Sequence, residues 1–204
     1  MSRRKRRERD SLYQKRQRDV NIIEILVSII ELKDPATARH CRSVAKYALA
    51  IGKELGLPGD KLDKLNQAAV LHDIGKILVD CRVLNNGEKL SDREFMEIKN
   101  HAARGMRILS LFSFHSCVID VAWHHHEKWD GTGYPDGLSG ETIHFLTRIV
   151  SVADALDAMT EDRPYREHLT DSKIVEQLQT ERGKQFDPEI ANAAIKLIRE
   201  KRIR

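Results

Sequence analysis

The chain has 204 residues, of which 41% are hydrophobic and 32% are charged, an ordinary composition for a soluble globular protein. No apolar run approaches the roughly 20 residues of a membrane-spanning helix, and the charged N-terminus is not a secretory signal. The three cysteines (Cys41, Cys81 and Cys117) are odd in number and form no C-x-x-C pair, which favours a reduced, cytoplasmic protein over a disulfide-linked one.

The net charge of +4 is unevenly distributed along the chain. Residues 1–18 hold nine Lys or Arg against two acids, so the other 186 residues have 26 basic and 29 acidic side chains. A nucleic-acid or anionic-lipid contact is one interpretation of this basic segment. We favour a solvated lead, disordered or helical, because it has no binding motif and no aromatic residue beyond Tyr13. The prediction is a lead at 1–18 and one domain at 19–204.

Apolar residues recur at helical spacing along nearly the whole chain, and strand signals are almost absent. Asp34-Pro35 and Gly56 mark helix ends, and Ser91 followed by Glu94 is a capping-box pattern. The segment 127–140 is polar and glycine-rich, which indicates a loop. We therefore expect an all-α fold, a compact bundle of about seven to eight helices. These helices are predicted at about residues 20–32, 37–55, 61–74, 91–109, 114–125, 142–159, 171–179 and 188–203.

Histidines and aspartates with metal-ligand chemistry gather near predicted helix ends and in one apolar helix. His101 falls in the middle of a predicted helix. Asp154 falls in the apolar run 149–156, where we expect its carboxylate to be buried, and a buried charge must be paired or metal-bound. Imidazoles and carboxylates without a thiolate suit iron, manganese, zinc or nickel. The candidate ligands are His40, His72, Asp73, His101, His125, His126 and Asp154.

Adjacent His72 and Asp73 would point about 100° apart on a helix. One could then ligate a first ion while the other bridges to a second. Two ions roughly 3.5–4 Å apart can hold a hydroxide and clamp both oxygens of a phosphoryl displacement. The pattern therefore indicates a binuclear hydrolase.

Several motifs in order resemble the HD-GYP group of the HD phosphohydrolase superfamily over about residues 31–190. His72-Asp73 followed by Gly75-Lys76 matches the HD motif. The segment 125–135, His-His-Glu-x-Trp-Asp-Gly-x-Gly-Tyr-Pro, matches the signature that names the group. The match continues through Arg148-Ile149, Ala153-Asp154, Arg163-Pro164-Tyr165-Arg166 and Phe186-Asp187-Pro188.

The resemblance implies two divalent metal ions, with iron or manganese favoured and zinc or nickel as alternatives. The first ion would be held by His40, His72, Asp73 and Asp154, and the second by His101, His125 and His126, with Asp73 bridging. His124 is then the extra histidine of the triplet. Some members carry a Glu that helps to hold a third metal, but Ala36 stands at that position here.

The resemblance also implies hydrolysis of cyclic di-GMP to pGpG or GMP by a metal-bridging hydroxide in the bacterial cytoplasm. Asp73 and Lys76 are the expected catalytic residues. Lys76, Tyr134, Arg163 and Arg166 are the expected substrate contacts. Surface ion pairing remains open for the two arginines, and a rigid turn remains open for Tyr134-Pro135. A GGDEF-type partner at the Gly-Tyr-Pro loop and a homodimer are further partners left open; no nucleic acid is expected.

Two other functions compete with this one. The first is an HD phosphohydrolase of another cyclic nucleotide, which would use the same ligands. The second is a catalytically silent sensing or docking module, which ranks lower because all seven ligand positions are filled. A purely structural helical protein would leave the histidine cluster and Asp154 unexplained.

Overall fold

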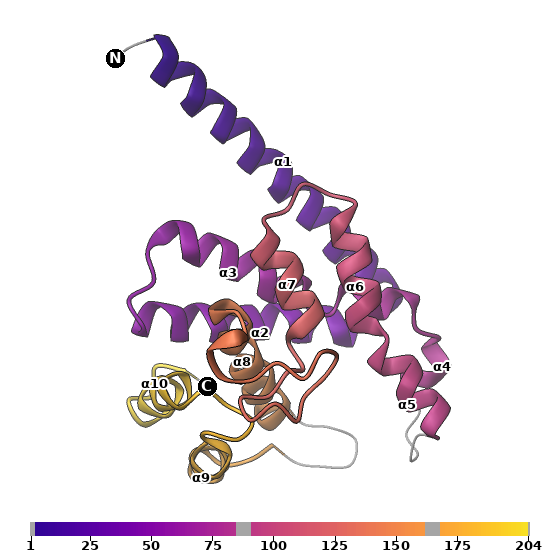
Figure 1. The fold of residues 1–204 in the computed structure, drawn as a ribbon, viewed down its shortest axis with the longest axis vertical. Coiled ribbons are helices and arrows are strands. Elements are labelled where there is room, and N and C mark those ends of the chain that lie inside the picture. Colours follow the sequence, from indigo (N-terminus) through magenta and orange to yellow (C-terminus); the bar gives the residue numbers. More distant parts are fainter. Residues whose placement is uncertain (1–2, 85–90, 162–167, 204) are drawn as a thin grey trace.

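Helix α1 (Arg3–Lys33) projects from the rest of the molecule at its N-terminal end, while its other end packs on α2 (Figure 1). The computed structural model describes residues 3–84, 91–161 and 168–203. The sequence predicted this helix only from residue 20, because apolar periodicity begins there. Leu26 and Ile30 anchor its C-terminal half in the core. The basic lead and the start of the domain thus share one helix, and the division between them stays a prediction.

Helices α2 (Pro35–Glu54) and α3 (Gly59–Leu71) form a hairpin at the centre of the bundle. The predicted break before α2 is confirmed, since the Asp34 side chain accepts hydrogen bonds from the first backbone N–H groups of α2 and Pro35 occupies its first turn. The facing sides of the hairpin are apolar and fully buried, as Ile51 and Leu65 illustrate. Burial of these side chains fixes the position of both helices.

The helix predicted for residues 61–74 is shorter than expected. It ends at Leu71, and after Asp73 the chain continues as the 3₁₀ helix η1 (Ile74–Leu78). His72 and Asp73 therefore lie in the transition between two helices. Gly75 is required there, because a Cβ at this position would lie 1.9 Å from the carbonyl oxygen of His101. The close contact brings η1 against α6 and Asp73 towards His101.

The prediction of a single helix over residues 91–109 is wrong. The capping box of Ser91 and Glu94 is present, but the helix divides at Asn100 into α5 (Asp92–Lys99) and α6 (His101–Ser110). Asn100 is the C-terminal cap of α5 and also the N-terminal cap of α6. The division makes His101 the first residue of a helix, where we had placed it in the middle of one.

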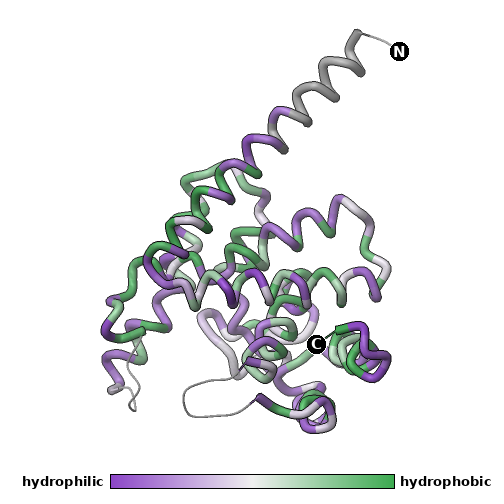
Figure 2. Tube along the Cα trace, turned by 180° about the vertical axis from the view of Figure 1, so that it is seen from behind, coloured by the Kyte–Doolittle hydropathy of each residue, from purple (hydrophilic) through white to green (hydrophobic). Residues whose placement is uncertain are grey.

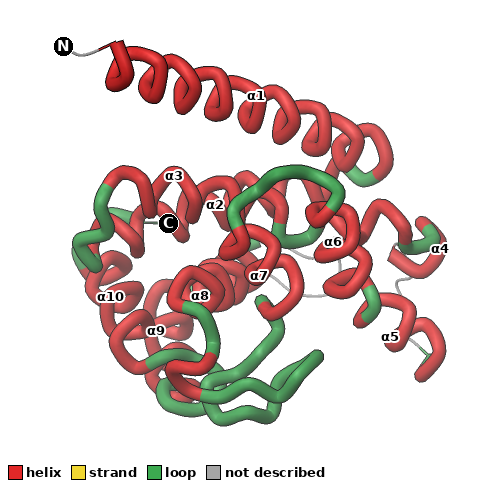
Figure 3. Tube along the Cα trace, turned by 45° about the horizontal axis from the view of Figure 1, so that its top comes forward, coloured by secondary structure: helices red, strands yellow, loops and turns green. Residues whose placement is uncertain are grey.

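The second half of the chain packs around α8 (Phe145–Thr160), which contacts α2, α3 and α7 (Ser116–His124). A long loop, with the short 3₁₀ helix η2 (Gly140–Thr142) near its end, connects α7 to α8 (Figure 3). Helices α9 (Asp171–Glu181) and α10 (Pro188–Arg199) close the bundle. Most of α8 is buried, which explains its apolar sequence.

The predicted all-α bundle is confirmed. The described residues contain helices, including the single turn α4 (Cys81–Leu84), and no β-strand (Figure 3). Hydrophobic and hydrophilic stretches alternate along the described helices, as expected when each buries one face (Figure 2). Among the described helices, none combines the length and the apolar character needed to cross a bilayer.

Candidate metal centre

The seven side chains singled out as candidate ligands meet at one place in the bundle, although they come from separate segments. The donor atoms of three of them lie within 4.8 Å of one another, and those of three others do the same. Asp154 approaches the first group, with Oδ1 3.0 Å from Nε2 of His40. The first group with Asp154 is called the His40 cluster below: His40, His72, Asp73 and Asp154. The second group is called the His101 cluster: His101, His125 and His126.

Asp73 lies between the two clusters and presents one oxygen to each. Its Oδ1 is 3.2 Å from Nε2 of His101 and 3.8 Å from Nε2 of His125. Its Oδ2 is 3.5 Å from Nε2 of His72 and 3.7 Å from Nε2 of His40. The carboxylate is only 2% exposed. This geometry is what a bridging ligand requires, since each oxygen can serve a different ion.

Three of the histidines are fixed in the same way, each by a backbone carbonyl three or four residues earlier. A carbonyl can only accept, so Nδ1 of each ring carries the proton and Nε2 carries the lone pair. In each case that Nε2 faces Asp73. The three pairs are His72 with Ala69, His101 with Ile98, and His125 with Val121.

The arrangement of these nitrogens fits a bound cation. Nε2 of His101 lies 3.2 Å from Nε2 of His125 and 3.2 Å from Nε2 of His126. His101 and His125 both point lone pairs into this space, so no hydrogen bond can join them. Nε2 of His72 is buried and has no hydrogen-bond partner, which is costly for a polar atom. Metal ions in the two clusters would satisfy all of these atoms.

The protonation states of the buried groups also suit metal binding, which needs neutral imidazole and ionised carboxylate. Burial lowers the pKa of His125 well below its ordinary value, and neighbouring His126 adds to the effect. Burial, with His101, lowers the pKa of His126 to about 4. Burial opposes ionisation of Asp73, but Lys76 and His72 hold the pKa of that carboxyl well below its usual range.

His40 is held by carboxylates. Its Nδ1 lies 2.6 Å from Oδ2 of Asp157, while its Nε2 faces Asp154. Burial would lower the pKa of His40, but Asp154 and Asp157 raise it to about 10. We expected Asp154 to be buried, yet its side chain is 27% exposed because it lines a cavity. Its neighbour Asp157, which the sequence did not single out, is the buried one at 7%.

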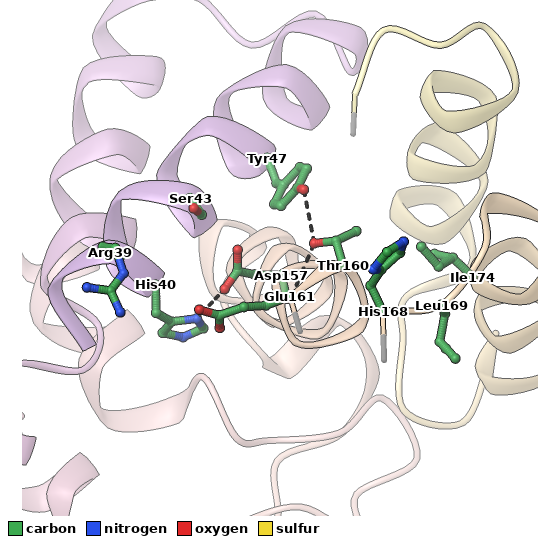
Figure 4. A pocket seen from close by; sticks show the side chains of 10 residues that line it. All are labelled: Arg39, His40, Ser43, Tyr47, Asp157, Thr160, Glu161, His168, Leu169 and Ile174. Atoms are coloured by element: carbon green, nitrogen blue, oxygen red, sulfur yellow. Dashed lines mark hydrogen bonds and ion pairs between the residues drawn. The ribbon is translucent and has the colours of Figure 1, made fainter. Parts of the chain in front are cut away.

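Both clusters border a cavity of about 490 Å³. His126 and Lys76 lie in its wall, together with Ala36, which offers no ligand. Nζ of Lys76 lies 2.6 Å from Oδ2 of Asp73, so its charge stands next to the shared carboxylate. A second cavity of about 350 Å³ also has His40 in its wall. Figure 4 shows the His40 ring pointing from α2 to the Asp157 carboxylate on α8.

Tyr134 lies against the His101 cluster. Its ring stacks on that of His126, with centroids 4.8 Å apart and planes inclined by 22°. Nζ of Lys99 stands 4.4 Å from the centre of the Tyr134 ring. The other two predicted substrate contacts, Arg163 and Arg166, lie outside the described residues.

The HD domain family model matches residues 24–190 of the chain. The chain belongs to the HD domain family. It is 37% identical over 176 residues to the cyclic di-GMP phosphodiesterase PA4108 of Pseudomonas aeruginosa. This match covers 85% of this chain and 42% of that protein. It is 36% identical over 168 residues to the 3′3′-cGAMP-specific phosphodiesterase 3 of Vibrio cholerae, covering 82% and 36% respectively.

Solved structures agree on the fold of this HD domain. Bd1817, an HD-GYP-type protein from Bdellovibrio bacteriovorus, superposes with a TM-score of 0.67 at 19% identity, covering 93% of this chain and 64% of that one. Together with the named relatives, this confirms the resemblance to HD-GYP proteins. The chain spans about half or less of the length of the curated relatives it matches.

The loop that follows His126 is held by hydrogen bonds between Glu127 and the backbone of Asp136 and Gly137. Oε1 of Glu127 accepts hydrogen bonds from the backbone N–H groups of Asp136 and Gly137 at 2.7 and 3.0 Å. A Cβ at Gly133 would lie 2.4 Å from the backbone nitrogen of Lys128, so only glycine fits. Glu127 therefore fixes the loop that presents Tyr134.

His124 faces away from both clusters. Its Nδ1 lies 2.9 Å from Oδ1 of Asp120, and its Nε2 lies 3.0 Å from Oδ2 of Asp136. The two carboxylates occupy both ring nitrogens, and His124 links α7 to the loop. This agrees with its interpretation as the extra histidine of the triplet.

Proposed function

We propose that this chain is a metal-dependent phosphodiesterase that hydrolyses cyclic di-GMP to pGpG, GMP or both. The observation that carries the proposal is the Asp73 carboxylate, which presents one oxygen to each of two clusters of ligand nitrogens. HD domain relatives named as cyclic di-GMP phosphodiesterases support the choice of substrate.

The proposed ligands are the seven residues of the two clusters, with Asp73 shared. Iron or manganese is favoured, and zinc or nickel also suits nitrogen and oxygen donors. Divalent ions held there would supply Lewis acidity towards a phosphodiester and lower the pKa of water. Ala36 in the cavity wall supports two ions in place of three.

Lys76 and Tyr134 are the proposed substrate contacts among the described residues. Nζ of Lys76 is beside Asp73 and faces the cavity, so it can offset charge on a non-bridging phosphate oxygen. The Tyr134 ring, stacked on His126, supports a base or sugar at the rim of the centre. Arg163 and Arg166 belong to the same proposal, as phosphate or guanine contacts.

The remaining parts of the proposal concern the setting of the domain. A cytoplasmic bacterial location follows from a nucleotide second messenger as substrate. A GGDEF-type partner would bind at the loop that carries Tyr134. A homodimer is supported by apolar side chains that α1 leaves exposed at Ile25, Ile29 and Leu32.

The test is turnover by protein reconstituted with iron or manganese under anaerobic conditions, with products separated by chromatography. Cyclic di-GMP should yield pGpG or GMP, and Asp73→Asn should yield neither. Metal-loaded protein that leaves cyclic di-GMP intact would rule out this substrate.

The second candidate substrate is 3′3′-cGAMP, because three relatives at 31–36% identity are named for it. The metal chemistry would be unchanged, so the two candidates differ only in base recognition. Comparing kcat/KM for both cyclic dinucleotides in one preparation separates them. A silent sensing module is disfavoured, since every proposed ligand is present; full cellular effect of a His72→Ala, Asp73→Ala double variant would restore it.

A further inference from the structure

Among the histidines of the two clusters, His40 is fixed by a distant side chain. The rings of His72, His101 and His125 donate to carbonyls within their own turn of chain. Nδ1 of His40 is instead 2.6 Å from a carboxylate oxygen of Asp157, 117 positions away. The Nδ1 side of this ring is therefore held by one residue of another helix, while its Nε2 side faces Asp154.

Asp157 is well placed to hold that ring. It lies on α8, three residues after Asp154, so both carboxylates point to the same side of the helix. Its side chain is 7% exposed, and a hydrogen bond to a buried carboxylate is stronger than one to a neutral acceptor. His40 turns Nε2 towards Asp154 and Asp73, and Nδ1 towards Asp157. Asp157 therefore contacts the ring nitrogen that faces away from the cluster, and we assign it no ligand role.

Loss of this contact would change what His40 offers to a cation. With Nδ1 unpaired, the proton can move to Nε2 or the ring can turn over, and either change removes the lone pair from the cluster. The His101 cluster would keep its geometry, because its two fixed rings rely on backbone carbonyls.

We infer that Asp157 is a positioning residue that orients His40 and is specifically required for metal binding in the His40 cluster. This goes beyond the proposed ligand set and rests on the proposed function only through its metal ions. Outer hydrogen-bond partners of metal ligands typically contribute 10–100-fold to metal affinity. The effect should be confined to one of the two ions.

The experiment is equilibrium dialysis of the full chain against Mn²⁺ at a fixed pH, with bound metal counted by elemental analysis. Wild-type protein should bind two equivalents. Asp157→Ala should weaken one equivalent by about 10–100-fold and leave the other unchanged. Asp157→Asn keeps the shape of the side chain and an oxygen that can accept from Nδ1. Its affinity for that equivalent should therefore lie between those of wild-type protein and Asp157→Ala.

The chain offers a matched control in Asp120, which also pairs with Nδ1 of a histidine, His124, at 2.9 Å but outside both clusters. Asp120→Asn should bind two equivalents with wild-type affinity. In a His126→Ala background, Asp157→Ala should weaken the remaining equivalent by the same factor of about 10–100; in an Asp154→Ala background it should add little, because both act on the same cluster.

Three results would overturn the inference. These are wild-type binding by Asp157→Ala, equal weakening of both equivalents by Asp157→Asn in protein with an unchanged thermal unfolding curve, and the same loss in Asp120→Asn. No nucleotide is used, so failure to cleave cyclic di-GMP would refute the proposed substrate and leave this result standing.

Discussion

The His40 cluster and the His101 cluster share Asp73 but are built on different principles. The His101 cluster consists of three imidazoles, and its two fixed rings are held by the backbone of their own segments. The His40 cluster adds the carboxylate of Asp154, and its His40 ring is paired with Asp157. The His101 cluster is set mainly by local backbone geometry, whereas the His40 cluster is assembled from side chains of helices far apart in sequence.

The difference also appears in protonation. Burial leaves His125 and His126 neutral, whereas two carboxylates favour the charged form of His40 despite its burial. His125 and His126 therefore offer neutral rings to a metal ion, whereas His40 in the metal-free protein favours its protonated form. The two halves of one candidate centre should respond differently to substitution, metal supply and pH.

The largest effect should come from removing what the clusters share. Asp73→Asn takes a charged ligand from both, so we expect both metal equivalents to be lost. Activity should fall by on the order of 10³-fold or more, since loss of a single preorganised charge-stabilising group already costs 10²–10³-fold. Metal analysis and turnover measure this. Asp80→Asn, which changes an exposed carboxylate paired with Arg82, is the control. Retention of either equivalent would show that Asp73 is not shared.

The next effect separates the clusters. His126→Ala should lose the equivalent in the His101 cluster, and Asp154→Ala should lose the one in the His40 cluster. Each should retain one equivalent and lose roughly 10²-fold in kcat, about the loss from one missing electrostatic contact. Stoichiometry at rising Mn²⁺ concentration tests this. If either variant lost both equivalents at once, the clusters would be one cooperative site.

The sequence identified the candidate ligands because each lies in a motif or beside a helix end, where local pattern is informative. All seven come together in the structure, while their roles as ligands stay predictions. The sequence did not predict the division of the helix at Asn100, since 91–109 has continuous apolar periodicity. Nor did it predict the end of α3 at Leu71, which depends on the close approach of Gly75 to α6.

Asp157 was missed for a different reason. The only local signal was a second aspartate three residues after Asp154 in an apolar helix. Its partner lies 117 positions away, and no periodicity reports a contact between two helices at that separation. Polar residues that act through a distant side chain are the part of this centre that required the structure.

A smaller effect concerns stability. The facing lone pairs and the unpaired Nε2 of His72 destabilise the metal-free protein, and a cation would remove that cost. At 100 times the dissociation constant, one ion contributes about 2.7 kcal/mol. This corresponds to a rise in Tm of roughly 5–10 °C per bound ion for a chain of this length, so wild-type protein with two ions should gain about twice as much. Calorimetry with and without a chelator measures it. In His126→Ala the rise should be about half as large, and an unchanged Tm on chelation in wild-type protein would contradict the fit of the clusters to metal.

The last effect is the pH dependence of the metal-free protein, in which the clusters act in opposite ways. Burial, with His101, lowers the pKa of His126 from 6.5 to about 4. Between these values the unfolded chain binds a proton that the folded chain does not, so the free energy of unfolding falls as pH drops through this window. For His40, burial is outweighed by Asp154 and Asp157, and the pKa rises from 6.5 to about 10. Its stabilisation is complete below pH 6.5 and is lost as pH rises towards 10.

Denaturant unfolding of chelator-treated protein at about pH 5, 7 and 9 resolves the two contributions. His126→Gln should flatten the decline on the acid side and leave the alkaline side unchanged. His40→Gln should do the reverse, because it removes the group whose proton the folded state retains. If both substitutions altered the same limb, the opposite electrostatic characters assigned to the two clusters would be wrong, although the shared position of Asp73 would still stand.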